Sequence, residues 1–191
     1  MTLARQGMAI PMFSQHQSRS YRLPLTKGAS MITQKRLKEL FDYDQQTGDL
    51  LWKQSGGRRK IGKVAGYVRC DGYKQIWADG KSRKAHRMVW VFHHAIDIDG
   101  EIDHINGNRS DNRIENLRVA TKSENQQNRK KAARINKSSG LIGVTARHNG
   151  WQARIQINGK PKHIGLFQTP EEAHLAYLRA KKELHPFSTI T

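Results

Sequence analysis

The chain has 191 residues, and its 34 lysines and arginines outnumber its 16 aspartates and glutamates, which gives a formal net charge of +18 at pH 7. This excess of positive charge makes a polyanion the natural partner. A membrane partner is not expected, because the longest apolar run, residues 88–92, is far shorter than the roughly 20 residues that span a bilayer. The single cysteine, Cys70, excludes an intrachain disulfide and a four-cysteine zinc site, and it suits a reducing cytosol.

The hydrophobic fraction of 36% is low for one large core, so we expect small modules joined by basic connectors. Residues 1–30 contain no acidic side chain and show neither a helical nor a strand period. Such a stretch cannot bury enough surface to offset the entropy lost on ordering. We therefore expect a disordered basic extension over residues 1–30 and a first domain that begins at residue 31.

The first domain is predicted to open with a helix in the run QKRLKELFDYD. Thr33 can cap this helix, and its buried face would consist of Leu37, Leu40 and Phe41. Residues 49–84 then contain four β-type runs, LLWK, VAGYVRC, YKQIWA and KSRKA, with hairpin turns at Asp-Gly pairs. A second helix is predicted over residues 86–95, HRMVWVFHHA.

The segment DHINGNRSDNRIENLRVATKSEN, residues 103–125, combines an Asp-His pair with an Asn-rich turn and two further asparagines. Residues 102–105 read as a short strand, and the Asn-Gly pair at its end is a strong turn signal. Thr121 and Glu124 have the form of a helix-capping box. The predicted order is hairpin then helix, with Asn125 in the first turns of the helix, where its side chain can meet Asp103.

These residue types suit the cleavage of a phosphodiester. A nuclease must activate water and neutralise charge on the leaving oxygen. Asp103 can supply a carboxylate oxygen to a divalent cation, and His104 can take the proton from water.

In this order and spacing the segment resembles the HNH endonucleases, whose ββα-metal motif begins with an Asp-His or similar pair, has a central Asn and ends with a His or Asn on the helix. The match is closest to the phage and intron-encoded homing type. The resemblance implies that Asp103 and Asn125 ligate the metal, that His104 is the general base, and that Asn116 hydrogen-bonds the His104 ring and fixes its tautomer. With Asn125 as the last ligand, oxygen donors favour Mg²⁺ or Mn²⁺ over Zn²⁺.

Each of these residues also has a plainer interpretation when taken singly. Asp111 and Asn112 are ordinary turn formers. His104 alone would be a common polar or core histidine, and Asn125 alone a solvated helix residue. Together, the four motif residues favour a nuclease site, and none of them alone would indicate one. These four are Asp103, His104, Asn116 and Asn125.

A basic connector follows at residues 128–137, with Arg129, Lys130 and Lys131 at its start and no acid. Two interpretations stay open at this point. The connector is either a solvated linker or a segment that lies along DNA phosphates.

The last segment, residues 138–191, predicts three strands broken at Asn149-Gly150 and Asn158-Gly159, then a helix capped by Thr169 with Pro170 in its first turn. Residues 138–184 are similar to the ethylene-response-factor (Apetala-type) DNA-binding domain. The similarity rests on the sequence pattern GV..R..GWQA.I...GK. That resemblance implies a three-stranded sheet that enters the major groove. The matching contact residues are Arg147, Trp151, Arg154 and Lys162.

We therefore predict an α+β chain in which an N-terminal helix and β-hairpins lead into a ββα-metal HNH motif, followed by a small three-stranded antiparallel sheet packed on one helix. The nuclease domain would span residues 31–127, with its core at 101–127. The predicted function is a metal-dependent endonuclease acting on double-stranded DNA, of the phage homing or free-standing HNH type, with no small-molecule substrate.

The cleavage products would carry 5′-phosphate and 3′-hydroxyl ends. A monomer is expected before a dimer, and the cytoplasm is the expected compartment, that of a bacterial host if the gene is phage-encoded. The alternatives are a non-catalytic sequence-specific DNA-binding regulator and a nonspecific HNH nuclease.

Overall fold

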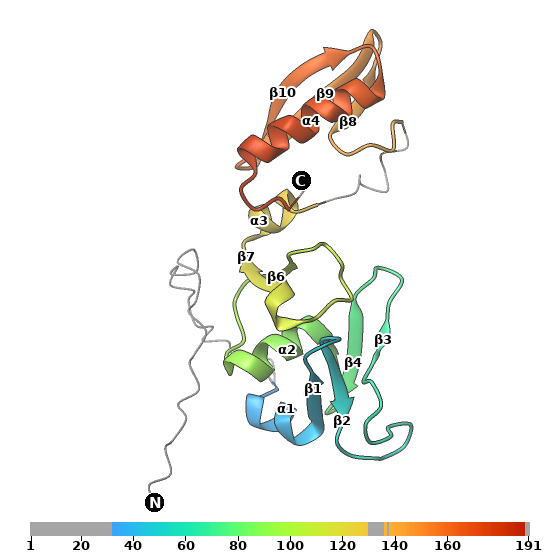
Figure 1. Ribbon diagram of the computed structural model, residues 1–191, viewed down its shortest axis with the longest axis vertical. Helices are drawn as coiled ribbons and strands as arrows, with labels where there is room; N and C mark the ends of the chain where they lie inside the picture. The colour runs from blue at the N-terminus through green and yellow to red at the C-terminus, as the bar shows by residue number, and fades with distance from the viewer. Residues whose placement is uncertain (1–31, 130–135, 137, 190–191) are drawn as a thin grey trace, which may run out of the picture.

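The computed structural model describes residues 32–129, 136 and 138–189. The predicted extension at residues 1–30 and the linker residues Lys130 and Lys131 lie outside the described residues. The fold is mixed α+β, as predicted, and Figure 1 shows two lobes with α3 between them. The elements of the first lobe are α1 (Gln34–Leu40), β1 (Phe41–Asp44), β2 (Asp49–Trp52), β3 (Tyr67–Val68), β4 (Lys74–Ala78), β5 (Lys81–Lys84), α2 (Ala85–His94), β6 (Glu101–His104), the 3₁₀ turn η2 (Ile114–Asn116), β7 (Leu117–Ala120) and α3 (Lys122–Gln127).

The first helix is shorter than the sequence predicts. Thr33 caps α1 as expected, its hydroxyl accepting a hydrogen bond from the Arg36 N–H at 3.2 Å. The helix ends at Leu40, because Phe41 adopts an extended backbone with φ −136° and starts β1, which pairs with β2. The run from Phe41 to Asp44 is therefore a strand that the helical interpretation missed.

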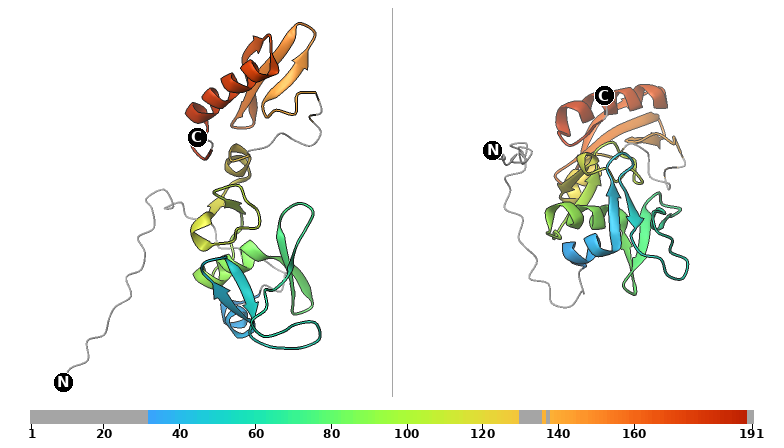
Figure 2. Two further views of the ribbon diagram at one scale, coloured as in Figure 1. Left: turned by 45° about the vertical axis from the view of Figure 1, so that its right-hand side comes forward. Right: turned by 60° about the horizontal axis from the view of Figure 1, so that its bottom comes forward.

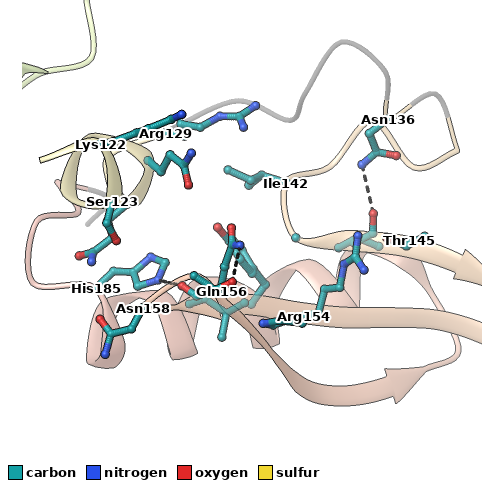
Figure 3. A pocket seen from close by; sticks show the side chains of 18 of the residues that line it. Lys122, Ser123, Arg129, Asn136, Ile142, Thr145, Arg154, Gln156, Asn158 and His185 are labelled. Atoms are coloured by element: carbon teal, nitrogen blue, oxygen red, sulfur yellow. Dashed lines mark hydrogen bonds between the residues drawn. The ribbon is translucent and has the colours of Figure 1, made fainter. Parts of the chain in front are cut away.

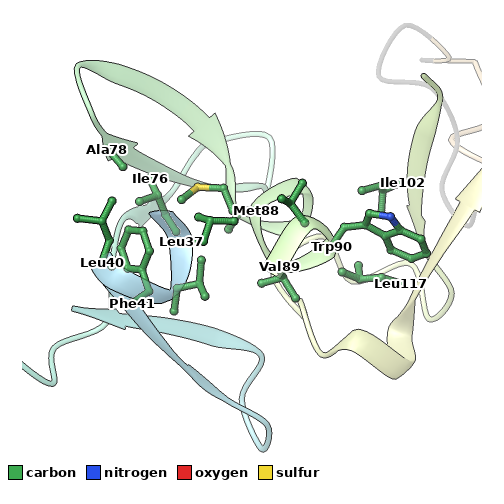
Figure 4. Close-up of a cluster of buried hydrophobic side chains, with 14 of the residues drawn as sticks. Leu37, Leu40, Phe41, Ile76, Ala78, Met88, Val89, Trp90, Ile102 and Leu117 are labelled. Atoms are coloured by element: carbon green, nitrogen blue, oxygen red, sulfur yellow. The ribbon is translucent and has the colours of Figure 1, made fainter. Parts of the chain in front are cut away.

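One hydrophobic core joins the elements of this lobe. Leu37, Phe41, Ile76 and Met88 are buried to 1% exposure or less. Figure 4 shows that the core continues along α2 to Trp90, which lies beside β6 and β7. Burial of apolar area is the main stabilising term in such a fold, so α2 anchors the hairpin that carries the predicted site.

The hairpin and helix at residues 101–127 have the predicted order. Strands β6 and β7 are antiparallel, and Asp103 lies opposite Arg118. A long loop, residues 105–116, joins them. Helix α3 starts at the predicted capping box, in which the Thr121 hydroxyl accepts from the Glu124 N–H and the Glu124 carboxylate accepts from the Thr121 N–H.

The second lobe is the predicted sheet and helix. Its elements are β8 (Val144–Arg147), β9 (Gly150–Ile157), β10 (Lys160–Phe167) and α4 (Pro170–Leu184), and the strand order is β10-β9-β8. Figure 2 shows α4 lying along one face of the sheet. Thr169 and Glu172 form a second capping box. None of the helices in the described ranges combines the length and apolar character that a membrane span requires.

Candidate active site

A cleft of about 820 Å³ lies beside the β6–β7 hairpin. Its walls come from residues 68–73 before β4, from residues 102–110 and from residues 125–129. Asp103, His104 and Asn125 all line it, so the structure brings three of the four predicted site residues to one cavity. The exposed Cys70 lines the same cleft.

The His104 ring is held by an asparagine. Its Nε2 lies 3.1 Å from Oδ1 of Asn112, and the two residues are 3% and 1% exposed. An amide oxygen only accepts hydrogen bonds, so this contact places the proton on Nε2 and leaves the lone pair on Nδ1. The ring also stands edge-on to His86, with centroids 5.1 Å apart.

Burial keeps both histidines neutral. Desolvation lowers the pKa of His104, and the hydrogen bond that the ring donates to Asn112 and the charge of Asp103 only partly oppose this effect. Desolvation also lowers the pKa of His86, to about 3, and the neighbouring His104 adds to the shift. At neutral pH the His104 ring is therefore an unprotonated base.

Asn116 does not make the predicted contact with the His104 ring. Its Oδ1 accepts the Asn106 N–H at 2.9 Å, and its Nδ2 donates to the Asp111 carbonyl at 2.8 Å. The side chain thus ties together the loop that follows β6. The contact with the ring belongs to Asn112, which the sequence presented as a turn former, because the loop folds back over the strand at that residue.

The loop that carries Asn112 is braced by the β1–β2 hairpin. The Tyr43 hydroxyl accepts the Ile114 N–H at 2.9 Å. Gly48, with φ +76°, lies so close that a Cβ there would be 2.2 Å from the Arg113 nitrogen. These two contacts fix the backbone on either side of Arg113.

The carboxylate of Asp103 is buried and has two side-chain partners. Arg118 donates to Oδ2 from Nε at 2.9 Å and from Nη2 at 2.7 Å. The Nδ2 of Asn128 lies 3.0 Å from Oδ2 and 3.3 Å from Oδ1. The predicted contact of Asn125 with Asp103 is therefore made by Asn128, one turn further along.

Asn125 instead donates its Nδ2 to the Glu101 carboxylate. No hydrogen bond to its Oδ1 occurs among the described residues. Asn128, in contrast, uses its Oδ1 to accept from Thr189 at 2.9 Å. Of the two helix-end asparagines, Asn125 is the one whose amide oxygen is available to a ligand.

These donors fit a hard divalent cation. Carboxylate and amide oxygens are the ligand types that Mg²⁺ and Mn²⁺ prefer, and the atoms in question are Asp103 Oδ1 and Asn125 Oδ1. Within the described ranges, no three His, Cys, Asp or Glu side chains come together as a metal cluster. The candidate site therefore depends on an amide oxygen and on water for its remaining ligands.

The four predicted DNA-contact residues of the second lobe divide between the two faces of its sheet. Residues directly opposite each other in an antiparallel pair share a face. Arg154 lies opposite the exposed His163, on the face away from α4, and Arg147 shares that face. Lys162 lies opposite the buried Ile155, on the α4 side. Trp151 packs against the core on the α4 side as well.

A second cavity, of about 1240 Å³, lies between α3 and the sheet (Figure 3). Lys122, Arg129 and Arg154 line it, and none of its described lining residues is acidic. Arg129 also lines the cleft with His104. The two cavities therefore meet at a cationic side chain.

Residues 83–127 match the family model described as HNH endonuclease, a family of enzymes that hydrolyse DNA phosphodiester bonds. The matched segment runs from the end of β5 through α3 and contains the cleft residues Asp103, His104 and Asn125. No curated protein and no solved structure matches the chain.

Proposed function

We propose that the HNH endonuclease domain at residues 83–127 cuts double-stranded DNA in a metal-dependent hydrolysis that leaves 5′-phosphate and 3′-hydroxyl ends. The observation that carries the proposal is the meeting of a buried neutral histidine with two oxygen donors in one cleft. His104, Asp103 and Asn125 all line that cleft.

His104 acts as the general base through Nδ1. A water molecule attacks the phosphorus and gives its proton to this nitrogen, while the bond from phosphorus to the 3′ oxygen breaks and that oxygen takes a proton from solvent water to become the 3′-hydroxyl. Asn112, by accepting from Nε2–H at 3.1 Å, holds the ring in the tautomer that this step needs. Asn116 supports the same loop through its two backbone hydrogen bonds.

Asp103 and Asn125 would hold the Mg²⁺ or Mn²⁺ ion. A bound divalent ion supplies charge neutralisation at the scissile phosphate and at the leaving 3′ oxygen. Arg118 and Asn128 keep the Asp103 carboxylate in place by donating to its oxygens. Glu101 does the same for Asn125 by accepting from its amide nitrogen.

The DNA backbone is proposed to pass from the cleft to the second cavity along Arg129. Lys122 and Arg154 line that cavity, and Lys130 and Lys131 belong to the same proposed contact. The residues have the charge that phosphate contacts require. Such contacts position the duplex without reading its sequence.

The second lobe is proposed to read sequence, which would make the chain a phage-type homing or free-standing endonuclease. Arg147 projects from the face of the sheet that α4 leaves open, and Arg154, on the same face, is assigned to the phosphate contact described above. An arginine can recognise guanine through two hydrogen bonds in the major groove. Trp151, in the central strand β9, and Lys162, in β10, lie on the face that α4 covers, so neither is part of the proposed contact.

The test is cleavage of supercoiled plasmid with Mg²⁺ or Mn²⁺, compared with EDTA and with Asp103→Ala and His104→Ala. His104→Ala should cut about 10²- to 10⁴-fold more slowly and bind DNA with unchanged affinity. His148→Ala, an exposed histidine in the β8–β9 turn, is the matched control and should cut at the wild-type rate on saturating DNA.

Four outcomes are informative. Metal-dependent conversion to open circle, lost in both variants, supports the nuclease. Wild-type cutting by His104→Ala overturns the role of the histidine. Tight, salt-sensitive binding without cleavage of several DNAs points to a non-catalytic regulator, and a smear in place of discrete bands on long DNA points to a nonspecific nuclease.

A further inference from the structure

The two side chains that hold Asp103 are themselves held by the C-terminal end of the chain. Arg118 and Asn128 supply the side-chain hydrogen bonds to the Asp103 carboxylate. Each of them also contacts the segment that follows α4, residues 185–189. This segment lies more than 60 residues further along the chain and belongs to the second lobe.

Phe187 contacts Arg118 in two ways. The Phe187 carbonyl accepts from Arg118 Nη2 at 2.7 Å, the same nitrogen that donates to Asp103. The guanidinium also lies over the Phe187 ring, with its central carbon 4.9 Å from the ring centroid. Since the side chain of Arg118 is only 17% exposed, these contacts restrict it to the geometry that reaches Asp103.

Thr189 contacts Asn128 from the other side. The Asn128 amide nitrogen has two hydrogens. It donates to the Asp103 carboxylate at 3.0 Å and to the His104 carbonyl at 2.8 Å. The single hydrogen of the Thr189 hydroxyl is shared between the Asn128 amide oxygen at 2.9 Å and the Ile105 carbonyl at 2.8 Å. The amide oxygen also accepts from the Thr189 N–H at 3.4 Å. The Asn128 side chain is thus fixed at both ends.

The segment is itself anchored to both lobes. The Ser188 N–H donates to the His185 carbonyl at 2.9 Å, which makes a tight turn after α4. Within α4, the almost wholly buried Lys181 donates to the Arg129 carbonyl, next to Asn128. Figure 1 shows the segment that follows α4 passing beside α3, in agreement with these contacts.

We propose that Phe187 and Thr189 are positioning residues of the nuclease centre, and that they orient the Asp103 carboxylate for metal binding through Arg118 and Asn128. The inference rests on the metal-binding role proposed for Asp103. According to this inference, the second lobe completes the active centre as well as contacting DNA. Cleavage then requires that the second lobe be packed against the first.

The experiment uses the full chain and three substitutions in the segment. Thr189→Val removes the hydroxyl at nearly constant shape, whereas Thr189→Ser keeps it. Phe187→Leu removes the ring and keeps the carbonyl. Pro186→Ala, an exposed neighbour in the same segment, is the control.

The first readout is the affinity for Mn²⁺ without DNA, from electron paramagnetic resonance of the free ion. The second is the kcat and KM for plasmid nicking, at a temperature where thermal unfolding shows every variant folded. Thr189→Val and Phe187→Leu should each bind Mn²⁺ about tenfold more weakly and show a lower kcat at an unchanged KM for DNA. Thr189→Ser and Pro186→Ala should match the wild type.

Wild-type Mn²⁺ affinity and kcat in both Thr189→Val and Phe187→Leu would overturn the inference. So would an equal loss in Thr189→Ser, because the hydroxyl would then not be the active feature. Asp103→Ala distinguishes this failure from a failure of the proposed function. If Asp103→Ala also keeps wild-type Mn²⁺ affinity and cleavage, the metal site itself is wrong; if it loses both, only the role of the segment is wrong.

Discussion

Asn112 Oδ1 lies 3.1 Å from His104 Nε2, while the Nδ2 of the same asparagine is buried without a hydrogen-bond partner among the described residues. Leaving a buried amide N–H unsatisfied costs about 1–3 kcal/mol. The single hydrogen bond to His104 offsets this cost only in part, and we attribute the asparagine at this position to the orientation of the proposed base.

Asn112→Ala and Asn116→Ala should differ in kcat. Asn112→Ala should lower kcat by about 10- to 100-fold, because the His104 ring loses its orienting partner, and it should also lower the free energy of unfolding by about 1–3 kcal/mol, because the buried His104 N–H loses its acceptor. Asn116→Ala should lower the free energy of unfolding by about 1 kcal/mol, because two partly buried backbone groups lose their hydrogen-bond partner, with kcat close to that of the wild type. Plasmid nicking and urea unfolding of the two variants measure both quantities. A larger loss of kcat in Asn116→Ala would return the orienting role to Asn116.

Gly48→Ala should disturb the candidate active site although Gly48 does not line it. The new Cβ would lie 2.2 Å from the Arg113 nitrogen and 2.4 Å from the Asn112 carbonyl carbon, so this backbone must move. A misplacement of about 1 Å can cost on the order of 10²-fold in rate. We expect a lower thermal midpoint and a lower kcat.

Gly62→Ala is the matched control for Gly48→Ala. Gly62 has a similar φ of +73°, and a Cβ there would meet nothing within 4 Å. The Gly62→Ala variant should lose only about 1 kcal/mol of unfolding free energy, because alanine is strained in a left-handed backbone conformation. Its kcat should be unchanged. Equal rates for the two variants would show that the β1–β2 hairpin does not brace the loop.

Asp111 should stabilise the fold above its folded pKa. The hydrogen bonds from Arg113 lower the pKa of this carboxyl from 3.8 to about 2, and the amide of Asn106 adds to the effect. A pKa that is lower in the folded state gives stability that is complete above the unfolded value and is lost as pH falls through the folded one. The difference in unfolding free energy between wild type and Asp111→Asn should thus be constant from pH 7 to 5 and shrink from about pH 4 to 2.

Urea unfolding at pH 6, 4 and 3 measures this difference. Asp42→Asn is the control, because the ion pair of Asp42 with Lys53 is exposed and should add little at any of these pH values. A difference for Asp111→Asn that grows on acidification would contradict the assignment.

Arg154→Ala and Lys162→Ala should separate the two faces of the C-terminal sheet. Arg154 lines the cationic cavity, whereas Lys162 lies on the α4 side. Arg154→Ala should weaken DNA binding and reduce the slope of log affinity against log salt by about one unit. Lys162→Ala should leave that slope almost unchanged. Titration of a fluorescent duplex at several salt concentrations decides between them, and a larger effect of Lys162→Ala would reverse the binding face.

Features encoded by neighbouring residues were predictable from the sequence. The caps at Thr33, Thr121 and Thr169 and the turn at Asn158 all depend on residues within one or two turns of each other, and each occurs in the structure. The Asp-His pair was visible for the same reason. Its role as a nuclease centre stays a proposal.

Features that depend on distant segments were not predictable. Asn112 and Asn116 are four residues apart in one polar loop, and only the fold of that loop decides which of them meets His104. Likewise, Thr189 in the tail carries no signal that it contacts Asn128, 61 residues earlier. The helix at residues 34–40 ended early because Phe41 pairs with Trp52 in the next strand, a contact that local helical spacing cannot anticipate.

The position of Cys70 has a practical consequence. It is the only cysteine in the chain, it is exposed, and it lies on the wall of the cleft that contains His104. A maleimide dye or spin label therefore has one cysteine to react with in the unmutated protein, and that cysteine lines the cleft proposed to bind DNA. Duplex seated there should shield the thiol from alkylation, so the rate of labelling becomes a direct gauge of occupancy that requires no engineered reporter.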